Sequence, residues 1–124
     1  MQHIQIGDIA HTEVVTANVA GTKAFYERTF GWKFQNLGPD MGNYEMATLP
    51  NGMTYGLRAP QPGNAGDKPG VVNYTLVPDV KKAVADAKKH GAQVMLEPQE
   101  VPGKGWFAIC LVQGTPHGVW QVMP

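Results

Sequence analysis

His11 and Glu13 are the two residues whose types and spacing most directly suggest chemistry. They lie in the run IAHTEVV, residues 9–15, which is rich in β-branched residues and predicts a strand. Two residues apart on a strand, both side chains point to the same face. A carboxylate beside an imidazole can act as a catalytic acid/base pair, with the pKa of the histidine raised by its neighbour. A buried polar pair that satisfies itself is the alternative, and the sequence leaves both open.

Strand alternation places further candidate ligand-binding residues on common faces of their own strands. Thr54 and Arg58 fall on one face of the run MTYGLRA, where the hydroxyl can hydrogen-bond and the guanidinium can bind a carboxylate or phosphate bidentately. Arg58 can equally extend into solvent at the strand end. In the second half of the chain, the same alternation predicts an aromatic and apolar wall made of Tyr74, Leu76 and Trp120. Such a wall suits a hydrophobic or planar ligand, although each of the three can also be ordinary core.

Other conspicuous side chains are assigned structural roles. The aromatic residues of the stretch FYERTFGW are predicted to pack a helix on a sheet: Phe25, Tyr26, Phe30 and Trp32. Cys110 lies in the middle of an apolar run and is predicted to be an inert core thiol. No partner is predicted for the remaining histidines, which are His3, His90 and His117.

The elements that must position these residues occur twice in the same order. The first half reads β-α-β-β-β: IAHTEVV, a helix from Val19 to a C-cap at Gly31, then WKFQNLG, NYEMATL and MTYGLRA. The second half reads VVNYTLV, the helix DVKKAVADAKKHG, then AQVMLEP, GWFAICLV and HGVWQVM. Asn18 and Asp79 fall at the two helix starts, where both residue types serve as N-caps.

Aligning the halves supports a duplication. TANV at 16–19 lies on VPDV at 77–80 with an offset of 61, and LPNGMTYGL at 49–57 lies on LVQGTPHGV at 111–119 with an offset of 62. We therefore expect one α+β domain over 1–124, with module one at about 7–59, a Pro/Gly-rich linker at about 60–70 and module two at about 71–124. The two sheets are expected to form a curved, barrel-like mixed sheet with the helices outside and a ligand on the concave face.

Composition narrows the class of protein. Ten basic and ten acidic residues cancel among 124, and no basic stripe appears, so no nucleic-acid partner is predicted. No apolar run reaches the roughly 20 residues of a membrane span, and the N-terminus does not resemble a signal peptide. With a single cysteine, these features predict a cytoplasmic protein that does not associate with membranes.

The segments HTEVVTANVAGTKAFYERTFGW, VVNYTLVPDVKKAVADAKKHGAQVM and EVPGKGWFAICLVQGTPHGVWQ resemble the glyoxalase/bleomycin-resistance/dioxygenase superfamily, also called vicinal oxygen chelate proteins. The resemblance covers roughly residues 9–121 and is closest to the glyoxalase-like branch. It implies paired βαβββ modules and a homodimer. It says little about reaction, because members isomerise, epimerise, cleave aromatic rings or sequester drugs.

The resemblance also implies where a divalent metal would be bound in metal-dependent members. The four ligand positions fall on His11, Gly56, Val72 and Gly118. Only the histidine has a donor side chain, whereas Mg²⁺, Ni²⁺, Zn²⁺ or Fe²⁺ needs several nitrogen or oxygen ligands. We therefore expect no cofactor; if a metal is present, His11 is its ligand.

The leading hypothesis is a metal-independent protein that binds a small apolar or aromatic molecule. The rival is an enzyme, a lyase or isomerase of the lactoylglutathione lyase type. Its metal-dependent version lacks three ligands, and its metal-independent version uses His11 or Glu13 to remove a proton. A third alternative is a degenerate module that serves only as a dimeric interaction domain.

Overall fold

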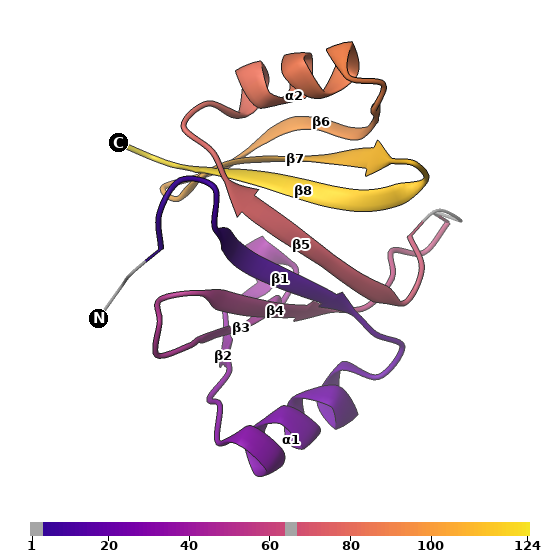
Figure 1. The fold of residues 1–124 in the computed structure, drawn as a ribbon. Coiled ribbons are helices and arrows are strands. Elements are labelled where there is room, and N and C mark those ends of the chain that lie inside the picture. Colours follow the sequence, from indigo (N-terminus) through magenta and orange to yellow (C-terminus); the bar gives the residue numbers. More distant parts are fainter. Residues whose placement is uncertain (1–3, 64–66) are drawn as a thin grey trace. The chain divides into compact units, whose positions relative to one another are not determined.

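The computed structural model describes residues 4–63 and 67–124 and separates into two compact units. One unit comprises His11–Val71, and the other comprises Ile4–Ala10 together with Val72–Pro124. Figure 1 shows the elements of both units in chain order. No helix in the described part of the chain is long and apolar enough to cross a membrane.

The first unit carries one βαβββ module. Its elements are β1 (Ile9–Val15), α1 (Val19–Phe30), β2 (Gln35–Asn36), a 3₁₀ turn η1 (Pro39–Met41), β3 (Glu45–Thr48) and β4 (Thr54–Arg58). The strands lie in the order β2-β3-β4-β1. β1 runs parallel to β4, whereas the β2–β3 and β3–β4 pairs are antiparallel.

The second unit repeats this connectivity. Its elements are β5 (Gly70–Leu76), α2 (Val80–Lys89), β6 (Gln93–Val101), β7 (Gly105–Val112) and β8 (Thr115–Val122). The strands lie in the order β5-β8-β7-β6, with β5 parallel to β8 and the other pairs antiparallel. The predicted α+β class, with two βαβββ modules that carry mixed sheets, is therefore confirmed.

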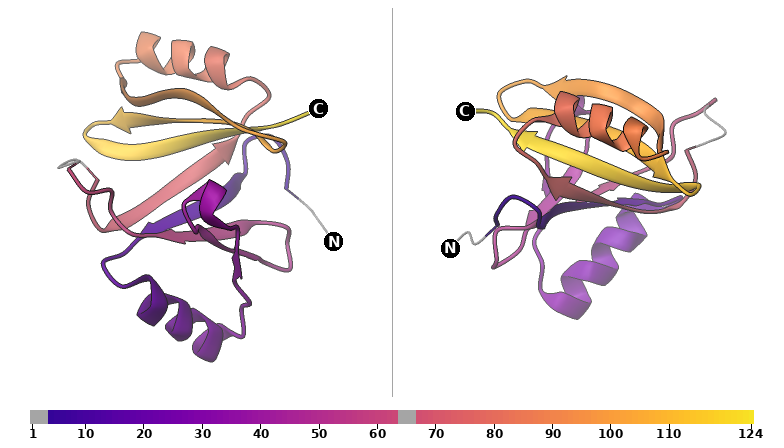
Figure 2. Two further views of the ribbon diagram at one scale, coloured as in Figure 1. Left: turned by 180° about the vertical axis from the view of Figure 1, so that it is seen from behind. Right: turned by 45° about the horizontal axis from the view of Figure 1, so that its top comes forward.

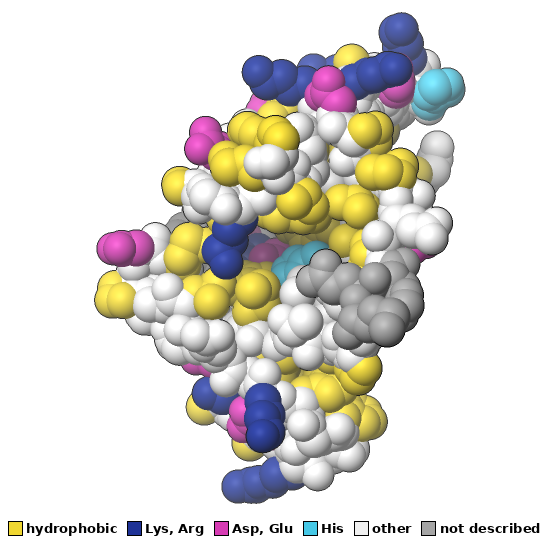
Figure 3. Space-filling model, turned by 90° about the vertical axis from the view of Figure 1, so that its left-hand side faces the viewer, with side chains coloured by type: hydrophobic (Ala, Val, Ile, Leu, Met, Phe, Trp, Pro, Cys, Tyr) yellow, Lys and Arg dark blue, Asp and Glu magenta, His cyan; other side chains and the backbone are white. Residues whose placement is uncertain are grey.

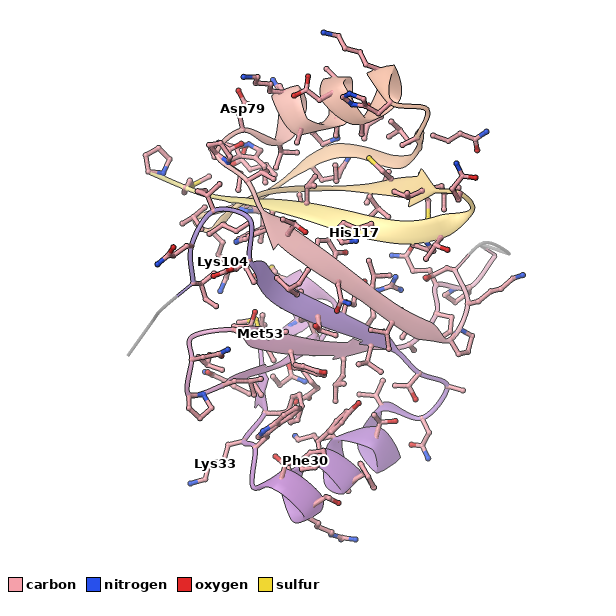
Figure 4. All side chains as sticks on the ribbon, viewed as in Figure 1. Phe30, Lys33, Met53, Asp79, Lys104 and His117 are labelled. Carbon is pink, nitrogen blue, oxygen red and sulfur yellow. The ribbon has the colours of Figure 1, made fainter. Side chains whose placement is uncertain are left out.

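The helix caps follow the prediction. The side chain of Asn18 accepts a hydrogen bond from the backbone of Gly21 at 2.9 Å, and Asp79 accepts one from Lys82 at 3.2 Å. Figure 4 shows Asp79 at the start of α2. Gly31 ends α1 with φ of 73°, a left-handed conformation that glycine adopts without steric cost.

Helix α2 buries one face against its own sheet. Val80 and Val84 pack on Ala108 and Cys110, and this cluster forms the core of the second unit. Two views of the ribbon show α2 lying on one side of β6, β7 and β8 (Figure 2). Its lysines are exposed, and the space-filling view shows positive side chains gathered over α2 (Figure 3). Burial raises the pKa of the Cys110 thiol, which agrees with an inert core cysteine.

Helix α1 packs less deeply. None of its residues is fully buried, and Phe25 and Phe30 are 57% and 55% exposed. Tyr26 stacks on Trp32 with a centroid distance of 5.2 Å and meets the ring of Tyr55 on β4 at 5.8 Å. Figure 4 shows Phe30 in the last turn of this helix. The aromatic residues thus join helix to sheet, but their outer members remain at the surface.

Candidate functional site

The parallel pairing of β1 with β4 sets the geometry of the candidate site. His11 lies opposite Thr54, and Glu13 lies opposite Gly56. Further along, Val15 lies opposite Arg58. The side chains of His11 and Glu13 both reach the hydroxyl of Tyr44, so the predicted common face is confirmed.

A chain of hydrogen bonds connects these residues. His11 Nδ1 lies 2.6 Å from Thr54 Oγ1, and His11 Nε2 lies 2.8 Å from the Tyr44 hydroxyl. The Tyr44 hydroxyl donates to Glu13 Oε1 at 3.1 Å. We call this set, Thr54–His11–Tyr44–Glu13, the β1–β4 polar chain.

The direction of each bond follows from the groups involved. Tyr44 has one hydroxyl hydrogen, and the Glu13 carboxylate takes it because an ionised carboxylate only accepts. The Tyr44 oxygen must therefore accept from His11, which places the imidazole hydrogen on Nε2. Nδ1 is then an acceptor, and Thr54 donates to it. All three hydrogen bonds point from β4 toward the Glu13 carboxylate.

The pKa of His11 differs from the expectation. Burial removes water from the imidazole and lowers its pKa to about 4, so the ring is neutral at pH 7. The prediction of a pKa raised by Glu13 was therefore wrong. Both side chains bond to the hydroxyl of Tyr44, and the loss of hydration on burial is the cause of the lowered pKa.

This lowered pKa predicts a pH dependence of stability. Above pH 6.5 His11 is neutral in the folded and the unfolded chain. As the pH falls toward 4, only the unfolded chain takes up the proton, so the free energy of unfolding should fall by on the order of 3 kcal/mol. Urea denaturation between pH 7.5 and 4.5 should show this slope, and His11→Gln should flatten it. His90→Gln, at an exposed position, is the control; equal slopes in wild type and His11→Gln would contradict the assignment.

Arg58 connects Glu13, the last residue of the β1–β4 polar chain, to a second carboxylate, that of Asp67. Its Nε lies 3.2 Å from Glu13 Oε2, and its two terminal nitrogens hydrogen-bond to Asp67 at 2.6 and 2.8 Å. Asp67 also accepts from the backbone of Gln61 at 2.7 Å. The guanidinium lowers the pKa of the Asp67 carboxyl, and the hydrogen bonds that Arg58 donates to Asp67 raise the pKa of Arg58. Arg58 therefore makes the predicted bidentate contact, but its partner is Asp67 of the same protein and not a ligand.

Tyr44 is the site residue that the sequence did not reveal. It falls within the predicted strand NYEMATL, where the sequence did not assign its side chain to a face, and in the structure it lies just before β3. A Cβ added at Gly56 would overlap the Tyr44 hydroxyl and ring, so only glycine leaves room for this side chain. A glycine in the middle of a β-strand is the sequence signal that marks such a close approach.

The second unit assembles the predicted aromatic wall on one face of its sheet. Tyr74 pairs with Gly118, and Leu76 pairs with Trp120, so these four positions share a face. The ring of Tyr74 covers Gly118 and meets Phe107 edge-on at 6.2 Å. Tyr74 is buried, whereas Leu76 and Trp120 are half-buried. A ligand-binding role for the three remains a prediction.

The other histidines have structural partners. His117, labelled on β8 in Figure 4, lies 2.7 Å from the hydroxyl of Thr75 through its Nε2. The Nδ1 of His90 lies 2.7 Å from the carbonyl oxygen of Asp86. His3 lies outside the described residues.

Comparison with protein-family models shows the family to which the protein belongs. The model of the Glyoxalase/Bleomycin resistance protein/Dioxygenase superfamily matches residues 8–121. The chain belongs to this superfamily. No curated protein was found to match it.

Solved structures share the fold of this superfamily member at low sequence identity. A hypothetical protein from Bacillus halodurans C-125 is 12% identical with a TM-score of 0.76, covering 97% of each chain. The methylmalonyl-CoA epimerase of Mycobacterium tuberculosis is 14% identical with a TM-score of 0.72, covering 98% of this chain and 95% of its own. A variant of the Streptomyces coelicolor epimerase, in complex with 2-nitronate-propionyl-CoA, is 17% identical with a TM-score of 0.67, covering 97% and 100%.

The side chains at or beside the positions that the resemblance assigns to metal ligands make other contacts in this superfamily member. Both ring nitrogens of His11 hydrogen-bond to hydroxyls, and the ring of Tyr44 fills the space in front of Gly56. In the second unit, the ring of Tyr74 fills the space in front of Gly118. Across residues 4–63 and 67–124, no three histidine, cysteine or acidic side chains cluster as metal ligands would.

Proposed function

We propose that this superfamily member binds a small apolar or aromatic molecule without a metal ion. The observation that carries the proposal is the β1–β4 polar chain, which uses both nitrogens of His11 and ends on a carboxylate paired with Arg58. Ligand sites are mostly apolar with a few fixed polar groups, and this chain supplies fixed polar groups. In the second unit, the predicted ligand contacts are Tyr74, Leu76 and Trp120, which share a face of its own sheet. A homodimer and a cytoplasmic location stay predictions.

The direction of the polar chain favours a second candidate function, metal-independent proton transfer. A proton delivered at Thr54 can pass through His11 and Tyr44 to the carboxylate of Glu13, because each hydrogen already points that way. A neutral imidazole of low pKa is a poor final base, so Glu13 is the proposed acceptor. Glu13→Gln should then abolish turnover while ligand binding largely persists.

A thermal-shift screen tests the leading proposal. Aromatic compounds should raise the melting temperature, since a ligand at a hundred times its Kd stabilises the folded state by about 2.7 kcal/mol. EDTA should leave the melting temperature and the binding unchanged. Retention of one metal ion per chain after purification, lost in His11→Ala, would contradict the metal-free site.

A further inference from the structure

The side chains of the β1–β4 polar chain offer a ligand more hydrogen-bond acceptors than donors. Thr54 donates to His11, His11 to Tyr44, and Tyr44 to Glu13. Thr54, neutral His11 and Tyr44 each have one side-chain hydrogen to donate, and each donates it to the next residue of the polar chain. The side-chain hydrogens of Thr54, His11 and Tyr44 are therefore used in bonds within the protein.

The guanidinium of Arg58 also uses most of its hydrogens in bonds within the protein. Its Nε faces Glu13, and its NH2 donates to Asp67. Its NH1 donates both to Asp67 and to the backbone oxygen of Ala59, at 2.6 and 3.2 Å. With one hydrogen assigned to each bond, four of the five N–H groups are used by residues that the structure describes. A ligand carboxylate would have to displace Asp67 to be held by both arms of the guanidinium.

Acceptor capacity and negative charge remain. The oxygen of Thr54 keeps its lone pairs after donating its hydrogen, and Thr54 is only half-buried. Two carboxylates, Glu13 and Asp67, accompany one guanidinium, which leaves this group with one net negative charge. The neutral imidazole of His11 adds no positive charge at pH 7.

We propose that the ligand of this face is a neutral or cationic aromatic molecule that donates a hydrogen bond to Thr54, and not a carboxylate or a phosphate. This inference rests on the proposed binding function and names the class of molecule bound. An alcohol, phenol or amine can donate a hydrogen bond to the oxygen of Thr54. An anion would find the donors of Arg58 already bonded to carboxylates and would be repelled by the net negative charge of Glu13, Asp67 and Arg58.

A matched set of probes tests the class. Benzylamine, benzyl alcohol and benzoate have similar size and differ in charge and in donor capacity. NMR titration at pH 7.5 should give the amine and the alcohol roughly tenfold or more tighter binding than benzoate, as expected for one polar contact made or refused. Equal or tighter binding of benzoate would overturn the inference and leave the binding function standing. Absence of binding by all three would count against the binding function itself.

Two substitutions separate the polar contacts. Thr54→Val keeps the side-chain shape and removes the acceptor, so it should weaken the alcohol and the amine and leave benzoate unchanged. Asp67→Asn removes one negative charge and releases donors of Arg58, so it should raise benzoate affinity by about tenfold. Asp86→Asn removes the same charge from the exposed face of α2 and should change none of the three affinities. If Asp67→Asn fails to fold, the Thr54→Val series still decides, and an unchanged preference there would overturn the inference.

Discussion

Replacing Glu13 by alanine should destabilise the protein by about 3 kcal/mol, the size expected when one member of a buried, charge-assisted pair is removed. Glu13 is only 8% exposed. Its carboxylate accepts from the Tyr44 hydroxyl on one oxygen and from Arg58 on the other. In the alanine variant both donors lose this acceptor in a largely dry environment. Urea denaturation with a fitted m-value measures the loss.

Two comparisons make this result specific. Glu13→Gln retains one amide oxygen as an acceptor but loses the charge, so its cost should be roughly half that of Glu13→Ala. Glu97→Ala removes an exposed carboxylate that lies 3.8 Å from Lys88, and such surface pairs contribute less than about 1 kcal/mol. If Glu13→Ala and Glu97→Ala cost the same, Glu13 does not hold the site together.

Replacing Gly56 by alanine should cost about 3 kcal/mol or more, although it adds a single methyl group. The new Cβ would overlap the hydroxyl and ring of Tyr44, so the tyrosine must leave its position or β4 must shift. Moving the ring would also break its bonds to His11 and Glu13. Thermal and urea unfolding of the variant measure the effect.

A double-mutant cycle identifies the cause of this loss. In the Tyr44→Ala background the space is open, so Gly56→Ala should cost far less than it does alone, with a coupling energy on the order of 2 kcal/mol. The matched control combines Gly56→Ala with Phe25→Ala, which removes an exposed ring of α1. That pair should be additive. Additivity of Gly56 with Tyr44 would show that the ring does not contact this strand position.

Periodicity and capping explain why most of the fold could be predicted from the sequence. The strand Ile9–Val15 and the helix Val19–Phe30 lie where β-branched alternation, the Asn18 cap and Gly31 put them. The 3₁₀ turn Pro39–Met41 was not predicted, because a single turn has too few residues to show a period. Period two also put Thr54 and Arg58 on one face, and the register then places Thr54 opposite His11.

The site was predicted only in part, because its decisive contacts do not follow a local period. Tyr44 fell in the predicted strand NYEMATL, but Asn43 has a positive φ of 55° and β3 begins only at Glu45, so alternation did not fix the face of its side chain. Asp67 meets Arg58 from across a Pro/Gly-rich segment, where the sequence gives no register. The pKa of His11 depends on how much water the folded chain removes, and spacing along a strand carries no information on that.

The polar chain gives the two ends of the site different hydrogen-bonding characters. Because the Glu13 carboxylate accepts at one end, every hydrogen points away from Thr54, and the threonine oxygen is an acceptor at the other end. The kind of hydrogen bond offered on β4 is therefore set by a charge carried on β1, through His11 and Tyr44.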